Sequence, residues 1–193
     1  ECYLRHLNNY FIVLYINESS DPITLSLKDT FPQIKVIYIS NQIKNGGLTA
    51  TWNSGIDLCL KEDCKSIILS NDDILFDNSI HCIIHQSFQC NKNNFCCFGP
   101  VSNNPAPSKE KHIQYSIGPS YKNSIILNKR DVNTDLNGFF MVFPSHTLIK
   151  NKFNKRYYFD PKFPFGGNEN EWFDRFLKKG GMPIIVSQTF IYH

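Results

Sequence analysis

Short apolar runs that alternate with helical patterns are the feature that most constrains how this chain can fold. Tyr10–Ile16 (YFIVLYI) is continuous and rich in β-branched residues, which is typical of a strand buried on both faces. Strands are expected at 10–16, 34–40, 66–70, 95–101, 138–144 and 184–192, and helices at 22–30, 48–61, 80–89, 145–150 and 168–179. This alternation predicts an α/β domain with a mostly parallel sheet flanked by helices.

Size and charge limit the classes of function. A chain of 193 residues fits a single domain, and a net charge of +3 is too small to indicate a nucleic-acid partner. No apolar run reaches the roughly 18 residues that a membrane span needs. No signal peptide is visible either.

The cysteines favour a reducing compartment. There are seven, an odd number, and no CxxC spacing occurs among positions 2, 59, 64, 82, 90, 96 and 97. Neither a zinc site nor a disulfide framework fits this pattern, so we expect several of the cysteines to be buried thiols and the location to be cytoplasmic.

Two acidic clusters carry the chemistry. Asn71-Asp72-Asp73 directly follows an apolar run, and Glu169 and Glu171 lie about a hundred residues later in the segment FDPKFPFGGNENEWFDR. Such a pair suits an enzyme that holds a divalent metal at one cluster and moves a proton at the other. The alternative is that these are solvated turn acids. In a parallel sheet, ligands bind beyond the carboxyl ends of the strands, so Asn17, Asn71 and His193 are expected to converge there.

Four segments, in this order, resemble a known family. They are 17–21 (NESSD), 45–56 (NGGLTATWNSGI), 68–74 (ILSNDDI) and 159–175. Together they resemble a GT-A glycosyltransferase of the family-two type, similar to rhamnosyl- and other transferases that use nucleotide sugars, over about residues 10–193. Ile16 and Asn168 depart from that pattern, because each stands where the family has an acid. Only nine residues precede Tyr10, so the family's first strand is expected to be missing or altered.

The resemblance implies a Rossmann-like fold and inverting, metal-dependent transfer of a hexosyl or deoxyhexosyl group. The donor would be a nucleotide sugar, UDP-linked or alternatively dTDP- or GDP-linked, and the acceptor a glycan or glycoconjugate hydroxyl. The implied metal ligands for Mn²⁺ or Mg²⁺ are Asp73 and His193, because a diphosphate leaving group needs positive charge. The implied base is Glu169, with Glu171 as the alternative. The implied donor contacts are Asn17, Ser19, Asp21, Asn45, Gly47, Asn53, Asn71, Asp72 and Arg175.

Several alternatives stay open at this point. Glu171 could instead cap a helix, since acids favour helix N-termini. Phe165 and Trp172 could stack on a sugar or lie in the core. Residues 1–101 are expected to bind the nucleotide sugar, and residues 102–193 to supply the acceptor contacts and the base. The rival functions are a non-catalytic sugar- or nucleotide-binding module and a nucleotidyltransferase, which would release pyrophosphate.

Overall fold

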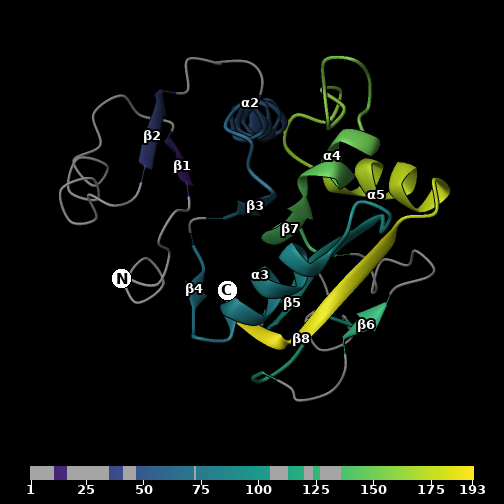
Figure 1. Cartoon of the computed structure of the whole chain (residues 1–193). Coiled ribbons are helices and arrows are strands. Elements are labelled where there is room, and N and C mark those ends of the chain that lie inside the picture. Colours follow the sequence, from purple (N-terminus) through teal and green to yellow (C-terminus); the bar gives the residue numbers. More distant parts are fainter. Residues whose placement is uncertain are drawn as a thin grey trace.

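The strands form two sheets (Figure 1). A computed structural model of the chain describes residues 11–16, 35–40, 47–71, 73–104, 113–119, 124–126 and 136–193. Within them, β1 (Phe11–Ile16) and β2 (Lys35–Ser40) pair in parallel as a two-stranded sheet. The second sheet has six strands in the order β3-β7-β5-β8-β4, with β6 paired to β8. Its strands are β3 (Ser66–Ser70), β4 (Leu75–Phe76), β5 (Cys96–Ser102), β6 (Ile125–Ile126), β7 (Phe140–Pro144) and β8 (Met182–Tyr192).

The larger sheet is mostly antiparallel, so the prediction of a mostly parallel sheet is wrong for it. Among its described strands, only β5 and β8 pair in parallel, whereas β7 runs antiparallel to both β3 and β5, and β8 antiparallel to both β4 and β6. Parallel neighbours need a crossover, which is usually a helix. No helix lies between β5 and β7 within the described residues, and the chain returns from β5 in the opposite direction.

Helices cover both faces of this sheet. They are α2 (Gly47–Lys61), α3 (Ile80–Gln89), α4 (Ser145–Lys150) and α5 (Asn168–Lys178), each within one residue of the expected bounds. Side chains of β7 alternate between two apolar clusters: Met141 and Phe143 join one that includes residues of α2 and α5, whereas Phe140 and Val142 join one that includes α3. Burial of β7 on both faces explains its continuous apolar sequence.

Trp172 lies at the centre of the core rather than at a binding surface. Its side chain is fully buried, and its ring contacts those of Phe143, Phe159 and Phe176. The idea that Trp172 stacks on a sugar is therefore wrong. Phe165, in contrast, is 76% exposed.

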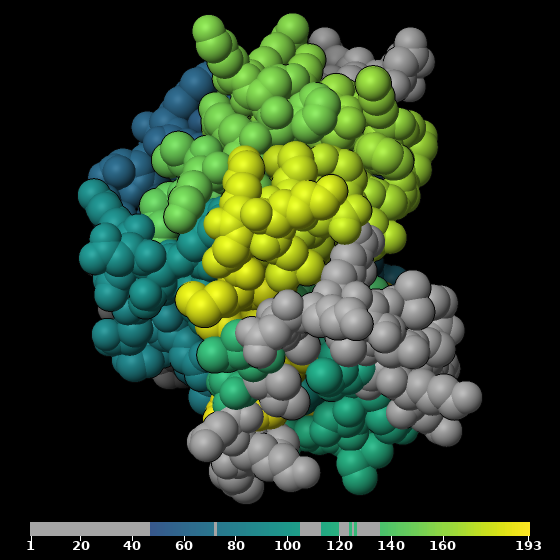
Figure 2. Space-filling model, turned by 90° about the vertical axis from the view of Figure 1, so that its right-hand side faces the viewer, coloured from purple at the N-terminus to yellow at the C-terminus, as the bar shows by residue number. Residues whose placement is uncertain are grey.

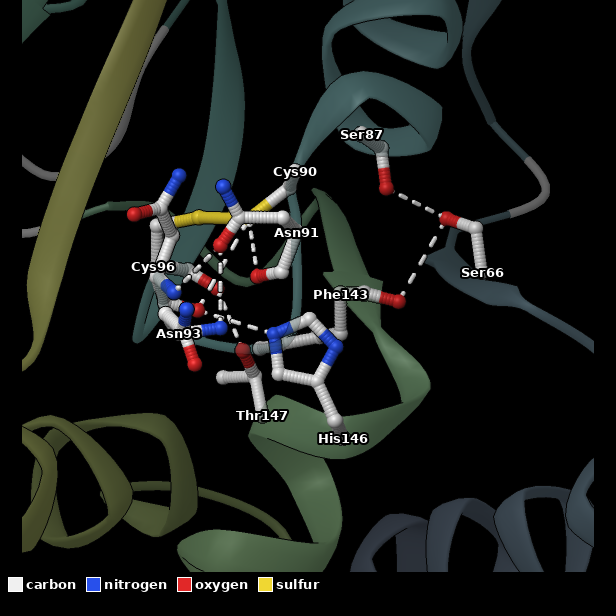
Figure 3. Close-up of a disulfide and its surroundings, with 10 residues drawn as sticks. Ser66, Ser87, Cys90, Asn91, Asn93, Cys96, Phe143, His146 and Thr147 are labelled. Atoms are coloured by element: carbon white, nitrogen blue, oxygen red, sulfur yellow. Dashed lines mark hydrogen bonds between the residues drawn. A yellow bond between two sulfur atoms is a disulfide. The ribbon is translucent and has the colours of Figure 1, made fainter.

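A disulfide joins Cys90, at the end of α3, to Cys96, the first residue of β5 (Figure 3). Thr147 on α4 donates to the Cys96 carbonyl oxygen at 2.8 Å, and the His146 ring donates to the carbonyl oxygen of Asn94 at 2.8 Å. The expectation of buried thiols is confirmed for Cys97, which is free and buried, but it does not hold for Cys90 and Cys96. A five-residue turn brings them together, and cysteine spacing alone does not show such a turn.

The last strand of the chain is an inner strand of the sheet, and its residues reach the surface (Figure 2). β8 lies between β5 and β4. In Figure 2, the C-terminal residues, in yellow, lie in the middle of the face toward the viewer. Within the described residues, no helix is long and apolar enough to cross a bilayer.

Candidate active site

Asp73 and His193 lie side by side, although 120 positions separate them in the numbering. Nε2 of His193 is 3.6 Å from Oδ1 of Asp73. The antiparallel pairing of β4 with β8, which sets Leu75 opposite Tyr192, brings them together, because each residue lies just beyond the paired positions. The Asp73 side chain is 68% exposed and that of His193 only 17% exposed. The pair is therefore open to solvent from the carboxylate side.

The imidazole of His193 is held from three directions. Its Nδ1 lies 3.1 Å from the carbonyl oxygen of Asn104, and its backbone N–H donates to Oδ1 of Asn103 at 2.9 Å. The Phe139 ring stacks on it, with centroids 5.1 Å apart and 16° between the planes. A carbonyl oxygen only accepts, so Nδ1 carries the proton. In the neutral ring, the lone pair is therefore on Nε2, which faces Asp73.

Gly138 and Phe139 connect this pair to Glu169. A Cβ atom on Gly138 would lie 3.4 Å from Oε1 of Glu169 and 3.6 Å from the ring of Trp52. The Glu169 carboxylate therefore lies close over Gly138. The next residue, Phe139, supports His193 and accepts a hydrogen bond from the backbone of Asn71 at 2.9 Å. The two sequence clusters thus meet at one short segment before β7.

The loop before Glu169 is fixed to the first turn of α2. The Thr49 backbone N–H donates to the Pro164 carbonyl oxygen at 3.1 Å, and the Thr49 hydroxyl donates to the carbonyl oxygen of Phe163. Gly47 has a φ of +60°, and a Cβ there would lie 2.4 Å from the Pro164 oxygen. Both the left-handed backbone and this close approach require glycine at position 47. Gly47 therefore helps to shape the loop that leads to Glu169.

Asn168 is buried beneath the same loop. Its Nδ2 donates to the Thr49 hydroxyl at 3.0 Å, and its Oδ1 accepts from the Glu169 backbone N–H at 3.0 Å. The side chain is only 1% exposed. Asn168, which stands where the resembled family has an acid, is thus a neutral anchor that fixes where α5 begins.

Glu171 is occupied by a structural ion pair. Nε and Nη2 of Arg175, one turn later on α5, donate to its two carboxylate oxygens at 2.5 and 2.9 Å. Arg175 also donates to the carbonyl oxygens of Asn151 and Tyr158. The expectations that Glu171 is an alternative base and that Arg175 contacts the donor stay predictions. Both charged groups are used in joining α5 to neighbouring backbone.

Asn53, whose expected donor-binding role stays a prediction, has a structural role in the fold. Its Nδ2 donates to the Phe159 carbonyl oxygen at 3.0 Å, and its Oδ1 accepts from the backbone N–H groups of Tyr158 and Phe159 at 2.8 and 2.9 Å. The side chain is buried. It holds the segment before the Glu169 loop against α2.

Other expected residues lie outside the described part of the chain: Asn17, Ser19, Asp21, Asn45 and Asp72. Within the described residues, no group of three or more His, Cys, Asp or Glu side chains is placed to hold a metal, so the arrangement there is the pair Asp73 and His193. Sequence reasoning missed Thr49, Asn103, Asn104, Gly138 and Phe139. Of these, only Gly138 gave a signal, as a glycine directly before an apolar run.

The comparisons with known proteins concern the fold. No family model and no curated protein sequence matches the chain. The chain is similar to a solved structure, "Crystal structure of GalNAc-T7 with UDP, GalNAc and Mn2+", with a TM-score of 0.63 and 11% sequence identity. The match covers 94% of this chain and 37% of that chain, so the chain spans little more than a third of that protein. The likeness to this glycosyltransferase supports a GT-A-like fold.

Proposed function

We propose that the chain is an inverting, metal-dependent glycosyltransferase domain. It would move a sugar from a nucleotide-sugar donor, UDP-linked, to a glycan or glycoconjugate hydroxyl. The observation that carries the proposal is that Glu169 and the Asp73–His193 pair approach opposite ends of the Gly138-Phe139 segment. A fold similar to that of a protein crystallised with UDP, GalNAc and Mn²⁺ supports it. Residues 1–101 would bind the donor, and residues 102–193 would supply the acceptor contacts and the base.

The donor atoms of Asp73 and His193 fit a divalent metal. Asp73 offers carboxylate oxygens, and His193 offers Nε2 because its Nδ1–H is directed at the Asn104 carbonyl oxygen. An imidazole ligand favours Mn²⁺ over Mg²⁺. When bound there, the metal would supply positive charge to the diphosphate leaving group.

Glu169 would act as the base. It would take the proton of the acceptor hydroxyl as the hydroxyl oxygen bonds to the anomeric carbon from the face opposite the leaving group. The electron pair of the breaking carbon–oxygen bond leaves with the diphosphate. Within the described residues, no hydrogen bond or ion pair occupies the Glu169 carboxylate. One positioned base is worth about 10²–10⁴ in rate.

The remaining donor and acceptor contacts are proposed from residues whose polar or aromatic groups are not already used within the protein. Asn71 and Gly47 stay in the proposed donor set, together with Asn17, Ser19, Asp21, Asn45 and Asp72. Asn53 and Arg175 are left out because their polar groups bind the protein itself. Phe165, exposed four residues before Glu169, would stack on the acceptor sugar.

The test is metal-dependent donor binding and turnover. Nucleoside diphosphate release is measured for UDP-, dTDP- and GDP-sugars with and without Mn²⁺, and UDP affinity is measured by calorimetry. Asp73→Ala and His193→Ala should each abolish the Mn²⁺-dependent part of the UDP affinity. The control, Asp174→Asn on the exposed side of α5, should retain it. Unchanged Mn²⁺-dependent affinity in both site variants would rule out the metal assignment.

A second candidate is a sugar- or nucleotide-binding module without turnover. The burial of Asn168, where the resembled family has an acid, favours it. Such a module would bind UDP-sugar with Mn²⁺ and release no more UDP than a Glu169→Gln variant does. The cytoplasmic location expected from the sequence is left out of the proposal, because the Cys90–Cys96 disulfide is typical of an oxidising compartment.

A further inference from the structure

The C-terminal turn of α2 brings two cysteines together. Asp63 has a φ of +54°, the Cys64 N–H donates to the Cys59 carbonyl oxygen at 3.0 Å, and the Asp63 N–H donates to that of Leu60 at 3.2 Å. These two bonds and the left-handed residue define a Schellman cap. In this cap the side chains at the positions of Cys59 and Cys64 commonly touch, and here both are cysteines.

The two side chains are in contact within a partly buried site. The Cys64 thiol lies close enough to Cys59 to affect its pKa, and both side chains pack against the apolar cluster that includes Trp172. Burial, followed by the adjacent Cys64 thiol, raises the pKa of Cys59 to about 12. Cys59 is therefore almost entirely protonated at neutral pH, and a thiol in this state is a poor nucleophile.

We propose that Cys59 and Cys64 are an oxidation site that closes to a disulfide across the C-terminal cap of α2. The cap holds the two residues in the same turn, so closing the disulfide requires no unfolding of the helix. The site repeats the arrangement of Cys90 and Cys96, where a disulfide ties the end of α3 to the following strand. A disulfide between Cys59 and Cys64 would likewise connect the end of α2 to the residues just before β3.

The oxidant belongs to the class of small-molecule disulfides. The Cys64 thiolate attacks one sulfur of the oxidant, which releases one small thiol and leaves a mixed disulfide on Cys64. Cys59 then loses its proton and attacks the Cys64 sulfur, which releases the second small thiol. In sum, two protein thiols lose two protons and two electrons, and the oxidant gains them as two thiols.

Once formed, the Cys59–Cys64 disulfide should resist reduction. Opening it at Cys64 expels Cys59 as the leaving thiolate, and a thiol of high pKa leaves slowly. The Cys59–Cys64 disulfide would lie at the opposite end of α2 from Gly47 and Thr49, which contact the loop before Glu169. Its closure should therefore change stability and leave the site unchanged.

Mass spectrometry of tryptic peptides can detect the Cys59–Cys64 disulfide, because trypsin separates the two cysteines. Lys44, Lys61 and Lys65 place Cys59 on the tryptic peptide 45–61 and Cys64 on the peptide 62–65. Lys92 likewise separates Cys90 from Cys96, so peptides 66–92 and 93–109 report the other disulfide. The reduced full chain is equilibrated with oxidised glutathione, alkylated and digested with trypsin in the absence of reductant. The peptide masses are then measured by mass spectrometry.

We expect the 45–61 and 62–65 peptides to be joined. Closure should raise the Tm by about 4–9 °C, as expected for a short closed loop in a protein of this size. Cys59→Ser and Cys64→Ser should each abolish the joined mass and the Tm rise, whereas Cys82→Ser, at an exposed cysteine outside both pairs, should retain them. Alkylated Cys59 and Cys64 in folded protein whose 66–92 and 93–109 peptides are joined would overturn the proposal. A glutathione adduct on Cys64 with no joined peptide would overturn it too.

Discussion

The Phe139 ring lies nearly parallel to the imidazole of His193, with 5.1 Å between their centroids. It is the flat support that keeps Nε2 of His193 directed at Asp73, since the Asn104 carbonyl oxygen fixes only the other ring nitrogen. Phe139→Leu keeps an apolar side chain and removes the flat surface. Mutation of a group that orients a metal ligand without binding the metal itself typically changes metal affinity by about 10–100-fold. We therefore expect Mn²⁺ affinity, measured by calorimetry, to fall about tenfold.

A matched variant separates this effect from a loss of packing. Phe95 is also buried, and its ring packs on Phe176 in the apolar cluster that includes Trp172. Phe95→Leu should cost a similar free energy of unfolding, about 1–2 kcal/mol, with Mn²⁺ affinity unchanged. Equal losses of Mn²⁺ affinity in the two variants would mean that Phe139 acts through stability alone.

Gly138 leaves the space that Glu169 occupies. In Gly138→Ala, the new methyl group would lie 3.4 Å from the carboxylate oxygen, in van der Waals contact with it, and would restrict the positions that the side chain can take. We expect turnover to fall about 3–10-fold with donor affinity nearly unchanged, because small misplacements act on the reacting geometry. The control is Gly166→Ala in the loop before Glu169, where a Cβ meets nothing within 4 Å. Steady-state kinetics would contradict the assignment if both alanines behaved alike.

The position of His193 beside the acidic cluster could be predicted, but the reason for it could not. The sequence placed both at the carboxyl ends of parallel strands. In the structure, β4 instead pairs antiparallel with β8, and this pairing brings Asp73 to His193. A strand of two residues, Leu75 and Phe76, has no periodicity that a pattern could detect.

The four described helices were predicted well because their apolar spacing and end signals are local, whereas the helix expected at 22–30 lies outside the described residues. The ion pair of Glu171 with Arg175 was also predictable, since an acid four residues before an arginine faces it on a helix. The roles of Asn53 and Asn168 were not predictable. Their partners lie more than a hundred positions away, at Phe159 and Thr49, and such contacts arise only from packing.

Asn53 should matter for stability more than for ligand binding. Asn53→Ala leaves the backbone N–H groups of Tyr158 and Phe159 buried without their acceptor. We expect a loss of about 2–4 kcal/mol in the free energy of unfolding, measured with urea. Ser54→Ala, one position along α2, should stay within about 0.5 kcal/mol. A stable Asn53→Ala protein that has lost donor affinity would instead restore Asn53 to the donor site.

Glu169→Gln and Glu171→Gln should have different effects, one on turnover and the other on stability. Glu171→Gln removes a charge that Arg175 contacts at two points, with both side chains less than a fifth exposed. We expect a loss of about 1–3 kcal/mol in the free energy of unfolding, and single-turnover transfer close to that of the parent where the protein is folded.

Glu169→Gln should do the reverse. A base acts in the transition state, so turnover should fall by about a hundredfold or more, with donor affinity and unfolding free energy nearly unchanged. The two variants are compared by single-turnover transfer at saturating donor and by urea unfolding. If Glu171→Gln is folded and inactive while Glu169→Gln is active, the base is Glu171, and the ion pair with Arg175 must open when the acceptor binds.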